Sequence, residues 1–411
     1  MKLVIKRGDS YVLLFIILLF QSGLRVLTKN NLIDDICTVL MLLCILLNYR
    51  YASNIISLYR NVSLALIIFF FLGIISNIRL QLQDYRAVFM DIYICFRFYI
   101  AFIAGCLLAI KSKCAQLRFK SASKLIILIL FVVTFINMFF INVFPTYSTR
   151  IIPCQQLFFE NPAEFASFVI ICMIMLIYSN QSVNENIIIY LIFGTLMVFS
   201  TVRLKSIGAV VLIWIVYVFF IKKITKSKIL FYIISLISVF CVGRDTFEYY
   251  YLNIKQPRAL LISKAINIAK DYFPFGTGFG TFGSYASRVF YSRLYSKYGL
   301  STVYGLSKDA GAYITDQMWA TVLAQFGVVG FVICVVFFVF MFKNIKKYCS
   351  TNIYSYGCCI YLLLYELLLT LAESALFNPS ALTIFFAMGY VMYSSYLNNK
   401  SSLIRGRKIC Q

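Results

Sequence analysis

The sequence predicts an all-α polytopic membrane protein with about twelve transmembrane helices and one long loop. Of the 411 residues, 62% are hydrophobic and only 13% are charged, whereas a soluble domain carries about a quarter charged residues. Apolar runs of roughly 15 to 25 residues recur along the chain, and such runs are long enough to cross the ~30 Å hydrocarbon core as helices. They are continuous and do not alternate with a period of two, which favours helices over a closed barrel.

We expect each span to be an apolar run bounded by polar residues. The segment Met1–Phe20 is typical of a signal peptide at first, but no small-residue cleavage site follows it, so we interpret it as a retained first helix. The second span is the weakest, because Asp34 and Asp35 stand at its start. The predicted spans are 11–28, 32–48, 62–78, 88–110, 125–144, 162–179, 187–202, 207–221, 229–243, 317–341, 355–375 and 381–397.

The distribution of basic residues predicts the orientation of these helices. If the N-terminus is cytoplasmic, the cytoplasmic segments hold 21 Lys and Arg residues and the short outer loops hold seven. Cytoplasmic loops of membrane proteins carry an excess of Lys and Arg, so we expect both termini to be cytoplasmic. The chain 1–411 then forms a single membrane domain, with the long loop 244–314 outside the membrane between the ninth and tenth helices. That loop holds nine more basic residues, but long loops follow the rule weakly.

The long loop contains two features of its own. Apolar residues recur at helical spacing over 258–273, which predicts a helix there. The stretch FPFGTGFGTFG (273–283) follows, and within it Gly278, Gly280 and Gly283 have the spacing of a dinucleotide-binding turn. A Rossmann turn requires a preceding strand and a cytosolic nucleotide, and neither fits an external loop preceded by a helix. Two interpretations remain: the glycines bend the chain back toward the membrane, or their amide groups bind an anionic ligand.

Charge and cysteine content exclude several classes of function. The formal net charge of +23 does not indicate nucleic-acid binding, because the basic residues are scattered among short loops. The 13 cysteines lie mainly in the apolar runs and show no Cys-x-x-Cys spacing. The sequence therefore supports neither a zinc site nor a disulfide framework.

Charged residues near the predicted helix ends indicate a polar site at the external interface. Arg203 and Lys205 open a helix at its N-terminus, where cations are unfavourable, and an anionic partner would remove this conflict. The helix dipole alone also explains the positions of Glu160, Glu164 and Asp316, because acids are favoured at helix N-termini. Arg97 and Glu366 lie deep in their spans, where a charge costs about 2.5–3.5 kcal/mol, and they are candidates to pair with each other. The residues that share the external level are Asp91, Glu160, Glu164, Arg203, Lys205, Asp316 and Glu373.

Five segments of the chain resemble the O-antigen polymerase/ligase superfamily of bacterial membrane glycosyltransferases, which includes the Wzy-type polymerases. The resemblance covers roughly residues 150–395 and lies in the order of the segments around the long loop. The segments are LFFENPAEFASF (157–168), STVRLKSIGAVV (200–211), ISKAINIAKDYFPFGTGFGTFG (262–283), DQMWATVLAQFGVVGF (316–331) and LAESALFNPSALTIFF (371–386). It implies a GT-C-like fold and the transfer of a glycan from polyprenyl diphosphate to an acceptor hydroxyl.

The resemblance also implies roles for particular residues. Arg203 and Lys205, with Arg258 from the loop, are expected to neutralise the departing diphosphate, and Gly278 and Gly280 to add backbone donors. Asp316 is the first candidate for the acid that orients or deprotonates the acceptor hydroxyl. Glu160 is the second candidate for that acid, and Glu164 is expected to bind substrate. No Asp-x-Asp motif occurs, so neither a metal ion nor a cofactor is expected.

The implied function is the polymerisation of lipid-linked repeat units of an O-antigen, capsule or exopolysaccharide in the bacterial cytoplasmic (inner) membrane. The expected partners are the polyprenyl-diphosphate-linked oligosaccharide, membrane lipids, a flippase and a chain-length regulator, but no nucleic acid. Three alternatives stay open: a ligase that uses another acceptor, a flippase or exporter of the lipid-linked sugar, and a structural scaffold. Tyr291, Tyr295 and Tyr298 are candidates to stack on sugars or to anchor the loop at the membrane interface.

Overall fold

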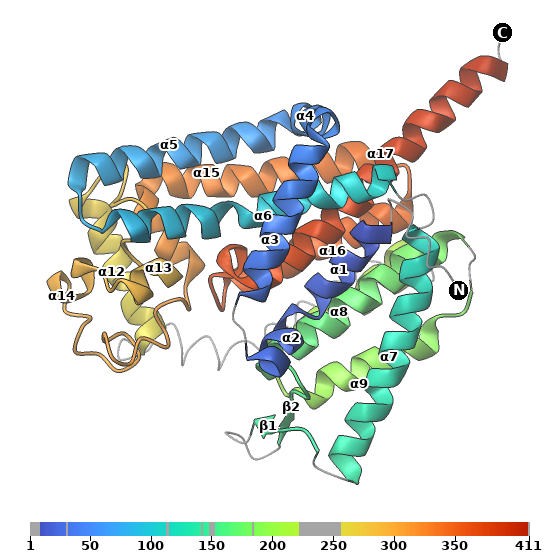
Figure 1. Ribbon diagram of the computed structural model, residues 1–411, viewed down its shortest axis with the longest axis horizontal. Coiled ribbons are helices and arrows are strands. Elements are labelled where there is room, and N and C mark those ends of the chain that lie inside the picture. Colours follow the sequence, from blue (N-terminus) through green and yellow to red (C-terminus); the bar gives the residue numbers. More distant parts are fainter. Residues whose placement is uncertain are drawn as a thin grey trace.

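The helices of the chain pack side by side in a bundle, with several short helices gathered at one end of it (Figure 1). The computed structural model describes residues 9–29, 32–111, 115–140, 143–147, 153–182, 185–221 and 256–409. Within them, seven helices are long and apolar enough to cross a membrane, or nine if two bent pairs each form one span. The chain is therefore a multi-pass helical membrane protein. The seven are α5 (Arg60–Leu80), α6 (Tyr85–Lys111), α7 (Ala115–Phe139), α8 (Pro162–Ser179), α15 (Met318–Cys349), α16 (Ile353–Thr370) and α17 (Pro379–Ile409).

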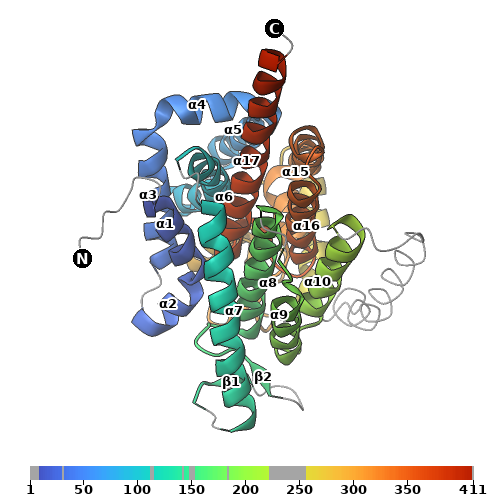
Figure 2. The ribbon, with the colours of Figure 1, turned by 90° about the vertical axis from the view of Figure 1, so that its right-hand side faces the viewer.

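Two predicted spans near the N-terminus are bent. The predicted span 11–28 consists of α1 (Asp9–Leu19) and α2 (Gln21–Thr28), which meet at an angle of 68°. The next pair, α3 (Ile33–Leu47) and α4 (Tyr49–Leu58), meets at 97°, so that α4 lies across the bundle (Figure 2). The hydropathy of the sequence predicts a loop at the residues of α4, so this helix was not predicted.

Asn48 lies at the bend between α3 and α4 and holds it by hydrogen bonds. Its side-chain amide donates to the Tyr11 hydroxyl at 3.0 Å and to the Cys44 carbonyl at 2.8 Å. On α4, Ala52 and Ile55 are buried, whereas most other residues of the helix are exposed. This narrow buried face packs against the bundle, where α4 contacts α6 and α5.

The middle of the chain fits the predicted spans less well. The span predicted at 187–202 contains α9 (Ile188–Ser200), and the span predicted at 207–221 overlaps α10 (Leu204–Ile215); these helices have 13 and 12 residues. Both are shorter than the ~20 residues that usually cross a bilayer. The span predicted at 229–243 and the start of the long loop lie outside the described residues, so the count of twelve stays a prediction. The remaining elements here are β1 (Thr146–Tyr147), its antiparallel partner β2 (Cys154–Gln155), the 3₁₀ turn η1 (Asn180–Ser182) and the π-helical η2 (Val216–Ile221).

The helices α6 and α17 approach each other closely. A Cβ atom on Gly105 would lie 2.0 Å from the Phe386 carbonyl oxygen, and one on Gly389 would lie 2.1 Å from the Phe102 carbonyl oxygen. Each helix therefore contributes a glycine at which the partner's backbone touches it. Small residues at such crossings let membrane helices approach closely and gain packing energy.

The beginning of α1 and the body of α17 show how the two ends of the chain lie. Phe15 stacks on Phe386 with ring centroids 5.1 Å apart, and the Gln21 amide donates to the Pro379 carbonyl at 2.7 Å. Residue numbers rise along α1 as they fall along α17, so the two helices are antiparallel. The start of α1 and the later turns of α17 therefore lie at the same end of the bundle. That this end is cytoplasmic stays a prediction.

The described part of the long loop folds over one end of the bundle. Its predicted helix 258–273 is present as α12 (Pro257–Asp271), and the loop continues through α13 (Tyr285–Val289) and α14 (Arg293–Lys297). Leu261, Phe282, Tyr295 and Leu306 are fully buried together in a small separate core. The 3₁₀ turn η4 (Ala375–Phe377) lies between α16 and α17.

Candidate functional site

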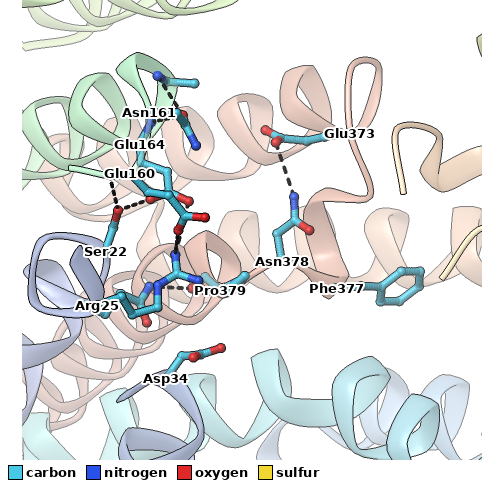
Figure 3. A network of polar contacts seen from close by, with 12 residues as sticks. Ser22, Arg25, Asp34, Glu160, Asn161, Glu164, Glu373, Phe377, Asn378 and Pro379 are labelled. Carbon is cyan, nitrogen blue, oxygen red and sulfur yellow. Dashed lines mark hydrogen bonds and ion pairs between the residues drawn. The ribbon is translucent and has the colours of Figure 1, made fainter. Parts of the chain in front are cut away.

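Charged residues from several helix ends meet at one end of the bundle. Arg25 of α2 forms ion pairs with Glu160 and Glu164 at 3.1 and 3.2 Å, between its Nη2 and one carboxylate oxygen of each (Figure 3). The Arg25 side chain is largely buried and that of Glu164 is half-buried, whereas Glu160 is exposed. Two of the predicted site residues are thus brought together by a cation that the sequence analysis counted only as an outer-loop charge.

The start of α8 positions these two carboxylates. Asn161 caps the helix, because its side-chain oxygen accepts from the backbone amides of Ala163 and Glu164 at 3.0 Å each. Pro162 follows at the first helical position, where its missing amide hydrogen costs nothing. Ser22 of α2 contacts the Glu164 carboxylate through its hydroxyl and accepts from the Glu160 amide at 3.3 Å. The same Asn-Pro pair that starts the helix therefore fixes the acids beside α2.

A second ion pair joins α10 to the residues after α16. Lys205 Nζ lies 2.8 Å from Glu373 Oε1, and the Asn378 amide donates to Glu373 Oε2 at 3.2 Å. The position of Lys205 at a helix N-terminus predicts an anionic partner. In the structure, Glu373 fills that role for Lys205.

A third ion pair joins the loop to the start of α15. Arg258 donates to Asp316 Oδ2 from Nε at 3.2 Å and from Nη2 at 3.0 Å. Burial raises the pKa of the Asp316 carboxyl above its ordinary value of 3.8, and Arg258 opposes this rise. The negative charge of Glu373 also raises the pKa of Asp316, and the positive charge of Lys205 lowers it, so both charges lie within electrostatic range of Asp316.

Glu373 connects these three groups of ion pairs, because its carboxylate interacts electrostatically with Glu164 and with Asp316. We call this connected set the charged rim. It consists of Arg25, Glu160, Glu164, Lys205, Arg258, Asp316 and Glu373. Five of the predicted site residues therefore belong to one electrostatic cluster, which lies at the starts and ends of six helices. Arg25 was missed as a member because a single Arg near the end of an apolar run carries no signal of its partner.

Arg203 differs from the cations of the charged rim. It lies two residues before Lys205, as the N-cap of α10, and its guanidinium stacks on the Tyr147 ring with 5.1 Å to the centroid. Its Nε is buried and makes no hydrogen bond, and no carboxylate among the described residues lies within ion-pair distance of it. Arg203 is thus a half-buried cation at the rim without a neutralising acid in the part of the chain that the structure describes.

The glycine stretch of the loop is inserted between helices. Residues 276–284 are buried. Gly278 donates to the Gln325 carbonyl at 2.7 Å, and Gly280 donates to Asp91 Oδ2 at 2.6 Å. Both glycines have positive φ, 90° and 74°. Their amides are satisfied within the protein, which favours the interpretation that the glycines shape the chain.

Phe279 belongs to this inserted stretch, and its ring packs edge-on against the Phe326 ring with 4.9 Å between the ring centroids. Here α15 breaks at Gly327 (φ 65°), and the Val329 amide donates to the Pro274 carbonyl of the loop at 3.4 Å. We call residues 274–283 the glycine wedge. Asp91, which the sequence analysis placed at the external level, is fully buried under this wedge and binds it.

The two deep charges do not pair with each other, so that prediction is wrong. Arg97 donates to Asp34 Oδ2 at 2.8 Å and to the Phe377 carbonyl at 2.7 Å. The acid that made the second span appear weak is therefore the partner of the deep arginine. Glu366 of α16 is fully buried, and neither carboxylate oxygen has a hydrogen-bond partner among the described residues.

The loop tyrosines have structural contacts. Tyr295 is buried, and its hydroxyl accepts from the Gly283 amide at 2.8 Å. Tyr291 stacks on Tyr295 at 5.2 Å and donates to the Leu306 carbonyl at 3.0 Å. The Tyr298 hydroxyl bonds to Asp271. These contacts place Tyr295 in the loop core.

Among the described residues, no three Asp, Glu, Cys or His side chains form a group that could hold a metal ion. Comparison with protein-family models and with curated protein sequences finds no match for this chain.

Proposed function

We propose that the chain is a membrane glycosyltransferase that polymerises polyprenyl-diphosphate-linked repeat units at the outer face of the bacterial cytoplasmic membrane. The observation that carries the proposal is the charged rim with Arg203 beside it. A substrate that is anchored in lipid and carries a diphosphate matches a site with cations at the ends of membrane helices. The resemblance of the five segments supports the same activity, with an O-antigen, capsule or exopolysaccharide as the product.

In the proposed reaction, a hydroxyl oxygen of the acceptor attacks the anomeric carbon at the reducing end of the donor glycan. The bond between this carbon and the diphosphate oxygen breaks, and polyprenyl diphosphate leaves with the electron pair. A carboxylate of the protein accepts the hydroxyl proton. Because the leaving group carries its own activation, the reaction requires no nucleotide.

The cations stabilise the negative charge that develops on the departing diphosphate. Arg203 is the first candidate, because no carboxylate among the described residues neutralises it. Its planar guanidinium donates to phosphate oxygens in bidentate geometry. Lys205 and Arg258 lie in the same cluster and contribute after partial release from Glu373 and Asp316. Preorganised charges of this kind are often the largest single contribution to catalysis.

Asp316 is the first candidate for the general base. Both Arg258 donors bind Oδ2, and no hydrogen bond between described residues engages Oδ1. Its raised pKa brings the carboxyl closer to the operating pH, which makes it a better proton acceptor. The side chain of Asp316 is 23% exposed, against 54% for Glu160 and 27% for Glu164, so Asp316 is the acid best shielded from water. Glu164 takes a substrate-binding role beside Arg25.

A ligase would use the same rim with another acceptor. A flippase or exporter requires polar groups that connect both ends of the bundle near the bilayer midplane. Of the two deep charges, Arg97 is neutralised by Asp34, and this favours a site at one end. Glu366 is the observation that favours transport, because buried ionisable groups in membrane helices are often functional.

The test is a reconstitution of purified protein in liposomes with lipid-linked repeat units and no added metal or nucleotide. We expect the glycan to lengthen, and we expect Arg203→Ala and Asp316→Asn to leave single repeat units. Lys124→Ala is the matched control, because Lys124 pairs with Glu185 beyond the other end of α8. Movement of units between leaflets without lengthening would support a transporter, and transfer only to a different acceptor would support a ligase.

A further inference from the structure

An apolar groove of about 210 Å³ lies between α12 and the first turns of α15. Its walls include Ile262 and Ile266 from α12 and Leu323 and Phe331 from α15. Leu371, at the end of α16, closes one side. Ile266 and Leu371 are 42% and 58% exposed, so the groove opens to the side of the bundle. Since α15 is long and apolar enough to span a membrane, we expect this opening to face the lipid.

The groove begins next to the charged rim. Arg258, Ile262 and Ile266 are four residues apart, and residues at this spacing lie on one face of a helix. This row runs about 12 Å along α12 at 1.5 Å per residue. It leads from the ion pair of Arg258 with Asp316 to the exposed edge of the groove. The two sites are therefore adjacent, with the charged one at the helix starts.

One polar group stands at the junction of the two. Gln317 lines the groove directly after Asp316; it is 2% exposed, and its Nε2 makes no hydrogen bond with any described residue. A buried amide donor without an acceptor is costly, and an oxygen of a bound ligand would satisfy it. The donor lies on the side of the groove at which the cations of the rim begin.

The wall opposite α12 is fixed in place. The Trp319 indole donates to Thr370 Oγ1 at 3.1 Å, and its ring packs against Phe331 at 5.4 Å. Ala320, the next residue, is small and 3% exposed. A rigid ring beside a small residue leaves a preformed channel for a hydrocarbon chain.

We propose that this groove binds the first isoprenoid units of the polyprenyl diphosphate, with the diphosphate at Gln317 and Arg258. The inference rests on the proposed function, which supplies a lipid with a diphosphate head. The groove is smaller than the roughly 300–1,000 Å³ of sites that enclose a whole ligand. It therefore holds the start of the chain while the rest stays in the bilayer.

Photocrosslinking in lipid nanodiscs tests the site with the full chain. The probe is farnesyl diphosphate that carries a benzophenone at the end of its isoprenoid chain. We expect its crosslinks to map to α12 and the first four turns of α15, and Ile266→Trp to reduce them about tenfold. The matched control is Val332→Trp, since Val332 is 53% exposed on α15 and does not line the groove. Crosslinks confined to other helices, or equal labelling of Ile266→Trp, would overturn the site.

A second measurement does not depend on a groove variant. The chain has two tryptophans, so Trp214→Phe leaves Trp319 as the reporter. A brominated farnesyl diphosphate is expected to quench its emission, and Trp319→Phe protein, which reports from Trp214, is expected to show none. If Trp319 emission is not quenched at concentrations that saturate crosslinking, the isoprenoid does not bind in the groove. A phosphatidylglycerol with a benzophenone on its acyl chain is the comparison probe. If it crosslinks to the groove equally well and farnesyl diphosphate does not displace it, the groove binds ordinary membrane lipid and the proposal is wrong.

The two proposals fail in different ways. If wild-type protein lengthens lipid-linked glycans while the groove stays unlabelled, the groove assignment is wrong and the function stands. If the groove binds the isoprenoid diphosphate but no transfer occurs, the site stands and the glycosyltransferase function is wrong.

Discussion

Lys205 and Glu373 form a 2.8 Å ion pair that links the start of α10 to the end of α16. Through Glu373 this pair connects the acids beside Arg25 with Asp316 and Arg258. The charged rim holds three cations and four carboxylates, and Arg203 beside it brings the formal charge to zero. A diphosphate that binds here competes with Glu373 and Asp316 for their cations. Arg203 has no such competitor among the described residues.

Arg203 is therefore expected to matter for activity and little for stability. Arg203→Ala should lower the rate of glycan lengthening about 100-fold or more, the usual loss when one preorganised donor to a developing charge is removed. Arg203→Lys should recover part of the rate, because it restores the charge without the planar fork. Reconstituted lengthening assays measure the rate, and thermal unfolding in detergent checks the fold.

Tyr147→Phe is the control for this prediction. It keeps an aromatic face under Arg203 and removes only the hydroxyl, so activity should stay near wild type. Long glycan from Arg203→Ala protein would remove Arg203 from the mechanism.

Asp316 is expected to set the acidic limb of the pH–rate profile. As a general base it works only when ionised, so activity falls as the pH drops through its folded-state pKa. Burial raises that pKa above 3.8, and the acidic limb of the profile moves up with it. The profile of kcat/KM against pH for wild type and Asp316→Asn measures this.

Asp316→Asn should lose most of the activity and should lack this limb. Glu160→Gln is the comparison, because Glu160 is the second candidate for the same role. An unchanged acidic limb in Asp316→Asn protein, or its disappearance in Glu160→Gln protein, would move the base to another residue.

Local signals in the sequence predicted several elements closely. The span 162–179 is α8, because Asn161 and Pro162 form a helix start that depends on neighbouring residues alone. The helix of the long loop likewise begins at Pro257. The bend after α3 was not predicted, since it depends on a hydrogen bond from Asn48 to Tyr11, 37 residues away.

The sequence predicted most residues of the candidate site but not the ion pairs between them. The level of each acid along its span follows from hydropathy, which brought Glu160, Glu164 and Asp316 to one end of the bundle. Which cation meets which acid depends on helix packing, and Arg25 and Glu373 acquire their partners only there. For the same reason Arg97 was assigned to Glu366, although Asp34 is its partner.

The Arg97–Asp34 pair is expected to be a stabilising element of the membrane domain. Both side chains are buried, and removal of one partner leaves an uncompensated charge. Arg97→Met should destabilise the protein by about 3–5 kcal/mol, and Arg97→Met with Asp34→Asn should recover much of this loss. Thermal unfolding of the purified variants in one detergent compares them. Equal losses in the single and double variants would show that the pair contributes through shape and not through charge.

The glycine wedge gives a test that separates structural glycines from ligand-binding ones. At Gly278 (φ 90°), a Cβ atom would lie 2.8 Å from the backbone nitrogen of Asn77. Gly278→Ala should therefore cost about 1–2 kcal/mol for the left-handed backbone and about 1–3 kcal/mol more for overpacking. Gly299→Ala is the matched control, because Gly299 also has a positive φ (69°) and no atom lies within 4 Å of an added Cβ.

Gly299→Ala should show only the backbone cost, so the difference between the two variants in thermal unfolding measures the packing of the wedge against α5. Glycan lengthening is measured on the fraction of each variant that remains folded. If the wedge is structural, folded Gly278→Ala protein keeps its activity, since its amide still donates to Gln325. If folded Gly278→Ala protein no longer lengthens glycans while Gly299→Ala protein still does, the glycine wedge takes part in ligand binding.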